Sequence, residues 1–168
     1  MLNQYLQNIL KTFKSGDTTE PSFYPDLKNF IEEFSKSKGI TTNITIQPKR
    51  IEAGAPDFTI RRGKELVGYI EAKDIGKDLE LFEYTPQIER YKKDFDNFIL
   101  TNYFDFWLWR KSEKKWILKT IISVGELIAL KLNQLPPLKN EENFFNLIET
   151  FLDFNIPERK TAKALATA

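Results

Sequence analysis

The order of hydrophobic and polar residues along the chain predicts helices first and strands after them. Apolar residues at helical spacing predict an amphipathic helix from Leu2 to Phe13, followed by a polar linker at 14–17. The same spacing predicts a second helix from Glu20 to Lys38, which ends at Gly39. Short apolar runs then predict three strands, at Asn43 to Pro48, Asp57 to Arg61 and Leu66 to Lys73.

The second half of the chain continues this alternation. Thr85 and Pro86 indicate a helix start, with Thr85 as the N-cap. The apolar run from Asn97 to Thr101 predicts a buried strand, and its arrival after a helix favours a parallel pairing. A hairpin that carries all three tryptophans is expected from Asp105 to Arg110 and from Lys115 to Ile122. Two final helices are expected at Glu126 to Leu132 and at Glu142 to Phe154. The tryptophans are expected to pack the sheet, with stacking on bases as the alternative.

This order predicts an α/β protein. A helix, three strands, a helix and a strand (αβββαβ) give a central mixed β-sheet flanked by helices, with an added hairpin and C-terminal helices. A chain of 168 residues with 41% hydrophobic content is suited to one domain with one core. Within that domain we expect an N-terminal helix and linker at 1–17, a catalytic core at 18–122 and C-terminal helices at 123–168.

Candidate chemistry gathers at the second and third predicted strands. A hairpin folded around Gly63 lays Asp57 beside Glu71. Strand alternation then puts Lys73 on the same side as Glu71, so two carboxylates and an ammonium converge. A Glu-x-Lys at a strand end is usually a solvated charge pair. Here, however, the strand is apolar up to Glu71, and charges at the end of a buried strand are costly unless they are paired or bound to metal.

Composition narrows the chemistry further. The chain has no His and no Cys, which excludes disulfides, His- or Cys-based metal sites and Ser-His-Asp hydrolysis. The opening residues are too polar for a secretory signal and no apolar run has transmembrane length, so we expect a soluble cytoplasmic protein with no membrane partner. The net charge is only +1. Local basic residues are therefore the candidates for DNA contact, namely Lys49, Arg61, Arg62 and Arg90.

The motif Pro56-Asp57 followed by Glu71-Ala72-Lys73 resembles that of the PD-(D/E)xK nuclease superfamily. The resemblance implies that Asp57 and Glu71 bind Mg²⁺, or Mn²⁺ in its place, with help from the Ala72 carbonyl. It also implies that Lys73 orients the attacking water and stabilises charge on the phosphate. Many such nucleases supply another acid from the preceding helix, and Glu20 matches that place as a metal-site and catalytic residue. The alternative is that Glu20 is a first-turn acid favoured by the helix dipole.

Gln87 and Tyr91 lie one helical turn apart just after the motif. They resemble the QxxxY element of RecB-like nucleases, which implies that Gln87 belongs to the catalytic group and that Tyr91 contacts DNA. The alternative is that Tyr91 packs the helix together with Ile88 and Phe95. Beside the motif, DNA contact is the favoured interpretation.

A more specific resemblance covers roughly 18–109. Four segments are similar to the N-terminal nuclease domain of single-chain restriction-modification enzymes, which fuse a nuclease to an adenine-specific DNA methyltransferase: Gly54 to Phe58, Gly68 to Gly76, Gln87 to Tyr91 and Leu100 to Tyr103. This similarity implies a Mg²⁺-dependent endodeoxyribonuclease that cuts double-stranded DNA, with methyltransferase and target-recognition domains in the parent chain. A transient dimer for double-strand cleavage is one option, and the sequence leaves open whether cutting needs it.

The chain itself carries no methyltransferase motif. Its Pro136-Pro137 pair sits between leucines, and its glycines are too scattered for a cofactor loop. The last residues, 158–166, are expected to form a helical lead into a further segment, so we expect a nuclease domain excised from a longer chain. The alternative function is a non-catalytic DNA-binding or scaffolding domain that keeps the nuclease fold.

Overall fold

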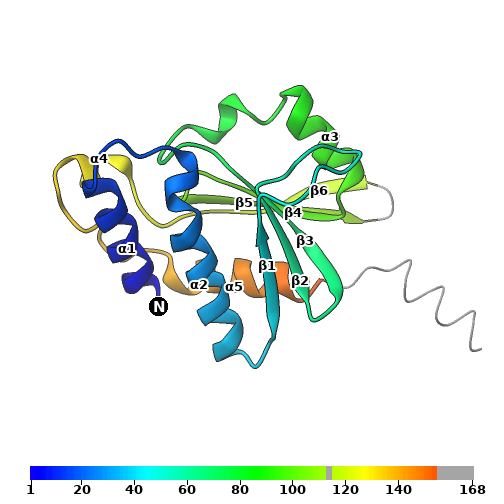
Figure 1. Ribbon diagram of the computed structural model, residues 1–168, viewed down its shortest axis with the longest axis horizontal. Coiled ribbons are helices and arrows are strands. Elements are labelled where there is room, and N and C mark those ends of the chain that lie inside the picture. The colour runs from blue at the N-terminus through cyan, green and yellow to red at the C-terminus, as the bar shows by residue number, and fades with distance from the viewer. Residues whose placement is uncertain (113–114, 155–168) are drawn as a thin grey trace, which may run out of the picture.

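A six-stranded mixed sheet forms the centre of the protein in the computed structural model, which describes the backbone of 1–112 and 115–154 and the side chains of 1–111 and 120–154 (Figure 1). The strands lie in sequence order, and every neighbouring pair is antiparallel except β3 and β4, which are parallel. Their bounds are β1 Thr42–Ile46, β2 Phe58–Arg62, β3 Glu65–Ala72, β4 Asn97–Thr101, β5 Asp105–Ser112 and β6 Lys115–Ser123. The predicted αβββαβ order and added hairpin are confirmed.

Helices pack on both faces of the sheet. One core lies under α1 (Leu2–Lys14), α2 (Tyr24–Ser37), α4 (Leu127–Lys131) and α5 (Glu141–Leu152). A second core lies under α3 (Pro86–Asp94), the crossover helix between the parallel strands β3 and β4, and it contains Trp107 and Trp109 with 8% and 2% exposure. The packing role predicted for these two tryptophans is confirmed. Among the described residues, no helix is long and apolar enough to span a membrane.

The helix predicted from Glu20 onwards is interrupted. Glu20–Phe23 form a short 3-10 helix (η1), and the α-helix begins only at Tyr24. Pro25 explains the break, because a proline ring inside an α-helix clashes with the carbonyl four residues earlier and is tolerated only in the first turn. Glu20 therefore lies in a 3-10 turn that precedes the α-helix.

The C-terminal end of α5 is held by polar side chains from three strands. Arg62 donates to the carbonyls of Leu152 at 2.6 Å and Phe154 at 3.3 Å. Arg110 donates to Thr150 O at 2.6 Å, and Asn97 donates to Phe151 O at 2.9 Å. Because the last carbonyls of a helix have no partner within the helix, these contacts fasten α5 to the sheet. The helical lead expected at 158–166 lies outside the described residues.

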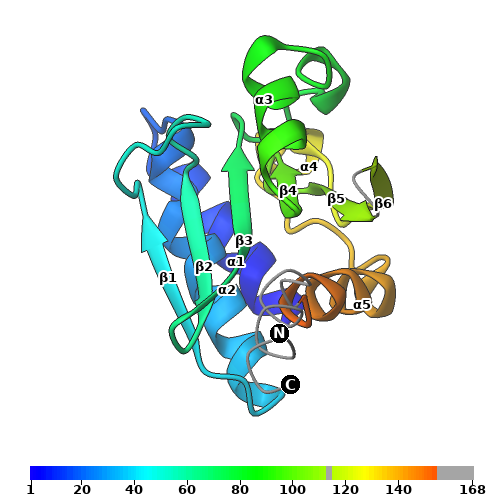
Figure 2. The same ribbon diagram turned by 90° about the vertical axis from the view of Figure 1, so that its right-hand side faces the viewer.

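The turn of the β2–β3 hairpin lies beside the end of α5, as Figure 1 shows. The start of β2 and the end of β3 lie at the opposite end of the hairpin, toward α3 in Figure 2. We call the first of these the turn end, which comprises residues 61–65. The second is the carboxylate end, which comprises Asp57, Glu71 and Lys73.

Candidate active site at the end of the β2–β3 hairpin

The structure brings the side chains of Asp57 and Glu71 together. The pairing of Phe58 with Ile70 places Asp57, just before β2, beside Glu71 near the end of β3. The two carboxyl groups lie within hydrogen-bonding reach of each other. Glu71 is only 4% exposed, and this burial together with the charge of Asp57 raises the pKa of Glu71 to about 9. At neutral pH the pair therefore holds a proton.

Two donors fix the Asp57 carboxylate. The backbone N–H of Ala72 donates to Asp57 Oδ2 at 2.7 Å, and the hydroxyl of Tyr24 donates to Asp57 Oδ1 at 2.5 Å. The hairpin therefore supplies one donor and helix α2 supplies the other. Since both carboxylate oxygens are engaged, the orientation of Asp57 is set by the fold.

Lys73 reaches the same place from β3 and is held by α3. Its ammonium donates to Gln87 Oε1 at 3.1 Å and lies 4.7 Å from the centre of the Phe82 ring. Its positive charge counteracts the rise in the pKa of Glu71. Gln87 in turn donates to the Tyr91 hydroxyl at 3.4 Å, so Lys73, Gln87 and Tyr91 form one hydrogen-bonded line.

Tyr91 corrects the sequence interpretation. Its side chain is 1% exposed and packs in the core under α3, so it has no surface to offer DNA. Gly54 closes over it: a Cβ at this residue would lie 3.2 Å from the Tyr91 ring and hydroxyl, and the backbone φ of +137° also disfavours a side chain. The packing alternative holds for Tyr91, whose hydroxyl accepts a hydrogen bond from Gln87.

Glu20 approaches the pair from η1. Its carboxylate lies 3.5 Å from the Tyr24 hydroxyl, and its backbone carbonyl accepts a 2.7 Å hydrogen bond from Tyr103. Burial, followed by the charge of Asp57, raises the pKa of Glu20 to about 7.

Tyr103 adopts a φ of +75°, a strained conformation for a bulky residue. It is stabilised there by a hydrogen bond from Tyr5 to its carbonyl and by one from its own N–H to Thr101.

The donor set suits a small hard cation. Two carboxyl groups meet in a buried place, and the charge of each disfavours ionisation of the other, which a bound cation would offset. Within 1–112 and 115–154, no group of three or more Asp, Glu, His or Cys side chains is gathered closely enough to hold a metal ion. Mg²⁺ commonly uses one or two carboxylates and completes its octahedron with water and substrate phosphate, so a two-carboxylate site is consistent with it.

The predicted basic residues separate into two groups. Arg61 and Arg62 lie at the turn end, about 13 Å and about 16 Å along the strand from Asp57 at ~3.3 Å per residue. Arg62 donates to the carbonyls at the end of α5, and its predicted role in DNA contact stays a prediction. Lys49 and Arg90 are both exposed, and Arg90 donates to Ala53 O at 3.4 Å in the turn that covers Tyr91. These two lie on the elements that surround the carboxylate end.

Sequence analysis missed Tyr24. The side chain is 4% exposed, packs edge-on against Phe58 and contacts both Asp57 and Glu20. The available signal was its spacing of four residues from Glu20, which places two side chains on one helical face. Its contact with Asp57, 33 residues away, depends on the packing of α2 against the start of β2.

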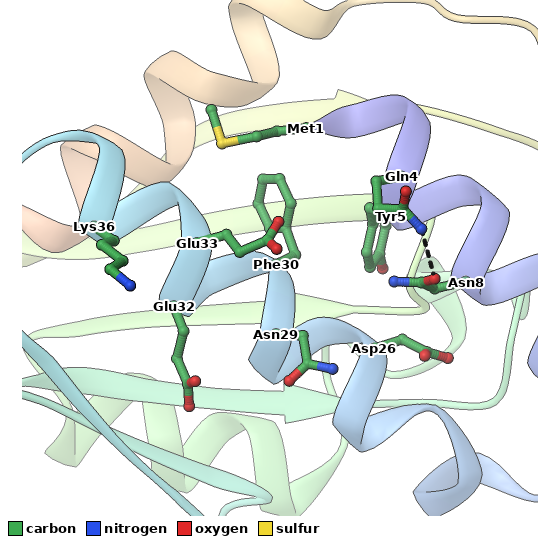
Figure 3. Close-up of a pocket in the computed structure, with 10 residues that line it drawn as sticks. All are labelled: Met1, Gln4, Tyr5, Asn8, Asp26, Asn29, Phe30, Glu32, Glu33 and Lys36. Carbon is green, nitrogen blue, oxygen red and sulfur yellow. Dashed lines mark hydrogen bonds between the residues drawn. The ribbon is translucent and has the colours of Figure 1, made fainter.

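A separate cavity of about 440 Å³ lies between α1 and α2 (Figure 3). Its lining includes Asp26, Asn29 and Glu33 but none of the residues of the carboxylate end. Asp26 accepts a 2.6 Å hydrogen bond from Thr12, and burial raises its pKa. The cavity is therefore distinct from the candidate active site.

Two solved structures are similar to the chain. A cryo-EM structure of a DrdV–DNA complex matches with a TM-score of 0.57 and 18% identity, over 92% of this chain and 14% of that one. A structure of the type IIG restriction endonuclease BpuSI matches with a TM-score of 0.43 and 16% identity, over 74% of this chain and 16% of that one. No protein-family model and no curated protein sequence matches. The chain thus spans a small part of the DrdV chain, and its α/β fold is restriction-endonuclease-like.

Proposed function

We propose that this chain is a Mg²⁺-dependent endodeoxyribonuclease module that hydrolyses DNA phosphodiester bonds within a restriction-modification enzyme. The observation that carries the proposal is the convergence of Asp57, Glu71 and Lys73 at one end of the hairpin. The restriction-endonuclease-like fold supports it, because the carboxylate end lies in the αβββαβ core of that fold.

Asp57 and Glu71 would hold the ion, with the Ala72 carbonyl as the third protein ligand. When bound, Mg²⁺ would neutralise charge on the scissile phosphate and lower the pKa of a water molecule. Mn²⁺ prefers the same oxygen ligands and is expected to substitute. Glu71 would give up its proton to become a ligand, since coordinating carboxylates are deprotonated.

Lys73 would act on the substrate directly. Gln87 and the Phe82 ring hold its ammonium in place, so little reorganisation is needed when negative charge develops on the phosphate. Gln87 would position Lys73 and the attacking water. Glu20, which lies just beyond Tyr24, would hold water through its carboxylate.

Double-stranded DNA is the proposed substrate. The DrdV structure contains DNA, and this chain corresponds to 14% of that protein. We propose that methyltransferase and target-recognition domains in a longer parent protein select the site, and that two copies associate transiently to cut both strands. Lys49 and Arg90 would contact the phosphate backbone beside the carboxylate end.

A plasmid-nicking assay tests the proposal. The wild-type chain should nick supercoiled DNA slowly with Mg²⁺ or Mn²⁺ at low salt and not in EDTA. Lys73→Ala should lose the activity, whereas Arg61→Ala, which removes an exposed cation at the turn end, should retain it. Nicking that persists in EDTA or in Lys73→Ala would contradict the mechanism. A chain that binds DNA but never cleaves it would instead support the scaffolding alternative.

A further inference from the structure

Tyr24 occupies an unusual place among the tyrosines of this protein. Its hydroxyl lies 2.5 Å from Asp57 Oδ1 and 3.5 Å from Glu20 Oε1. By contrast, the buried hydroxyls of Tyr5 and Tyr103 donate to backbone carbonyls, each at 2.7 Å. Tyr24 is therefore the buried phenol that contacts side-chain carboxylates of the candidate site.

A phenol has one proton to donate, and the two distances decide where it goes. A hydrogen bond to an ionised carboxylate at about 2.5–2.7 Å is short and strong, while 3.5 Å is at the outer limit for any hydrogen bond. The proton of Tyr24 is thus committed to Asp57. Glu20 receives at most a weak contact, which leaves its carboxylate available to water.

The position of Tyr24 is itself fixed by packing. The ring is 4% exposed and meets Phe58 edge-on, with 5.0 Å between ring centroids and an interplanar angle of 70°. Phe58 directly follows Asp57 in the chain. The ring therefore packs against the residue next to Asp57, and the hydroxyl donates to Asp57 itself. The hydroxyl and the Ala72 N–H together fix the orientation of the Asp57 carboxylate.

We infer that Tyr24 is a positioning residue for the divalent cation: its hydroxyl fixes the Asp57 carboxylate in the orientation that binds the ion. This inference rests on the proposed function, because it assigns Tyr24 to the same metal site. Outer partners of this kind orient the ligands of a metal, and their loss typically costs about 10–100-fold in metal affinity or activity.

The test is Mn²⁺ binding by the full chain, followed through the electron paramagnetic resonance signal of free Mn²⁺. Tyr24→Phe removes only the hydroxyl and keeps the ring on Phe58. Tyr5→Phe is the matched control, because it removes a buried hydroxyl that donates to a backbone carbonyl. Glu20→Gln tests whether Tyr24 acts through its weaker contact. Thermal melting of each metal-free variant reports on the fold.

We expect Tyr24→Phe to raise the dissociation constant for Mn²⁺ about tenfold or more. Tyr5→Phe should change it less than about twofold, and Glu20→Gln should change it less than Tyr24→Phe does. Equal affinity in Tyr24→Phe and the wild type would overturn the inference. So would a loss in Glu20→Gln that matches the loss in Tyr24→Phe, or a Tyr24→Phe chain that unfolds while Tyr5→Phe folds. A wild-type chain that binds no Mn²⁺ would instead overturn the proposed function.

Discussion

The two ends of the β2–β3 hairpin both carry clustered charges, yet the structure treats them in opposite ways. At the turn end, the Arg62 guanidinium donates hydrogen bonds to carbonyls at the C-terminal end of α5, where the helix dipole favours a cation. At the carboxylate end, Glu71 is buried beside another acid and retains a proton to remain there. The first cluster is electrostatically satisfied by the fold, and the second is not.

Whether a charged group is paired within the fold therefore distinguishes structural residues from candidate catalytic residues better than the number of charges does. Burying a carboxylate next to a like charge costs free energy that neither packing nor the single nearby ammonium of Lys73 removes. An arrangement of that kind is typical of functional sites.

The largest expected effect is on cleavage. Asp57→Asn keeps the shape of the side chain but removes a charged ligand, so the rate of plasmid nicking should fall about a thousandfold or more, equivalent to about 4 kcal/mol of transition-state stabilisation. The same measurement on Arg62→Ala should give the wild-type rate per folded molecule. Asp57→Asn cutting at the wild-type rate would remove the carboxylate end from the mechanism.

The second effect is on stability, and here the larger loss is expected at the turn end. Arg62→Ala leaves the carbonyls of Leu152 and Phe154 without the donor that Arg62 supplies, and we expect the free energy of unfolding to fall by about 1–3 kcal/mol. Urea denaturation measures this loss. The matched control is the exposed neighbour Arg61, whose replacement by Ala should change the free energy of unfolding by less than about 0.5 kcal/mol. Equal losses in the two variants would show that α5 does not depend on Arg62.

The third effect is a pH dependence confined to the carboxylate end. In the folded chain the pKa of Glu71 is raised to about 9, whereas an ordinary glutamate has a pKa of about 4.5. The folded state therefore binds more protons between these values, and Glu71 makes the metal-free fold progressively less stable as the pH rises through this range.

Thermal melts of the wild type and Glu71→Gln across this pH range measure that dependence. The two melting temperatures should diverge in favour of Glu71→Gln as the pH rises. Mg²⁺ should raise the wild-type melting temperature more at high pH than at low pH, because the ion competes with the proton. Parallel melting curves for the two proteins would show that Glu71 ionises in the ordinary way.

The smallest effect concerns DNA affinity. Lys49→Ala should weaken DNA binding by a few-fold and reduce the slope of log affinity against log salt by about one, because one phosphate contact is lost. Arg61→Ala, at the turn end, should leave the slope unchanged. Fluorescence anisotropy with a short duplex at several salt concentrations measures both. A reduced slope for Arg61→Ala would place DNA at the wrong end of the hairpin.

Local patterns in the sequence predicted most of the fold. The strands, the α3 crossover and the parallel pairing follow from periodicity, caps and turns that lie within a few residues of one another. The helical spacing of apolar residues does not show the break between η1 and α2, which depends on Pro25. Strand pairing across one turn also brought Asp57 to Glu71, which needed no long-range information.

The remaining parts of the site depend on packing between distant segments. Nothing local to Arg62 shows that α5 ends beside it, 90 residues later. Tyr91 was assigned to DNA because its spacing from Gln87 does not reveal that the turn at Gly54 covers it. Tyr24 was overlooked for the same reason, since its acceptor lies on another element.

The most direct test of the account is the position of a bound ion. Crystals of the chain with a short DNA duplex, soaked in Mn²⁺, should show an anomalous difference peak between the carboxylates of Asp57 and Glu71, and none at the turn end. The Tyr24 hydroxyl should still contact Asp57 in that complex. An anomalous peak elsewhere in the complex, with none at Asp57 and Glu71, would contradict the assignment of this hairpin end as a metal-dependent nuclease site.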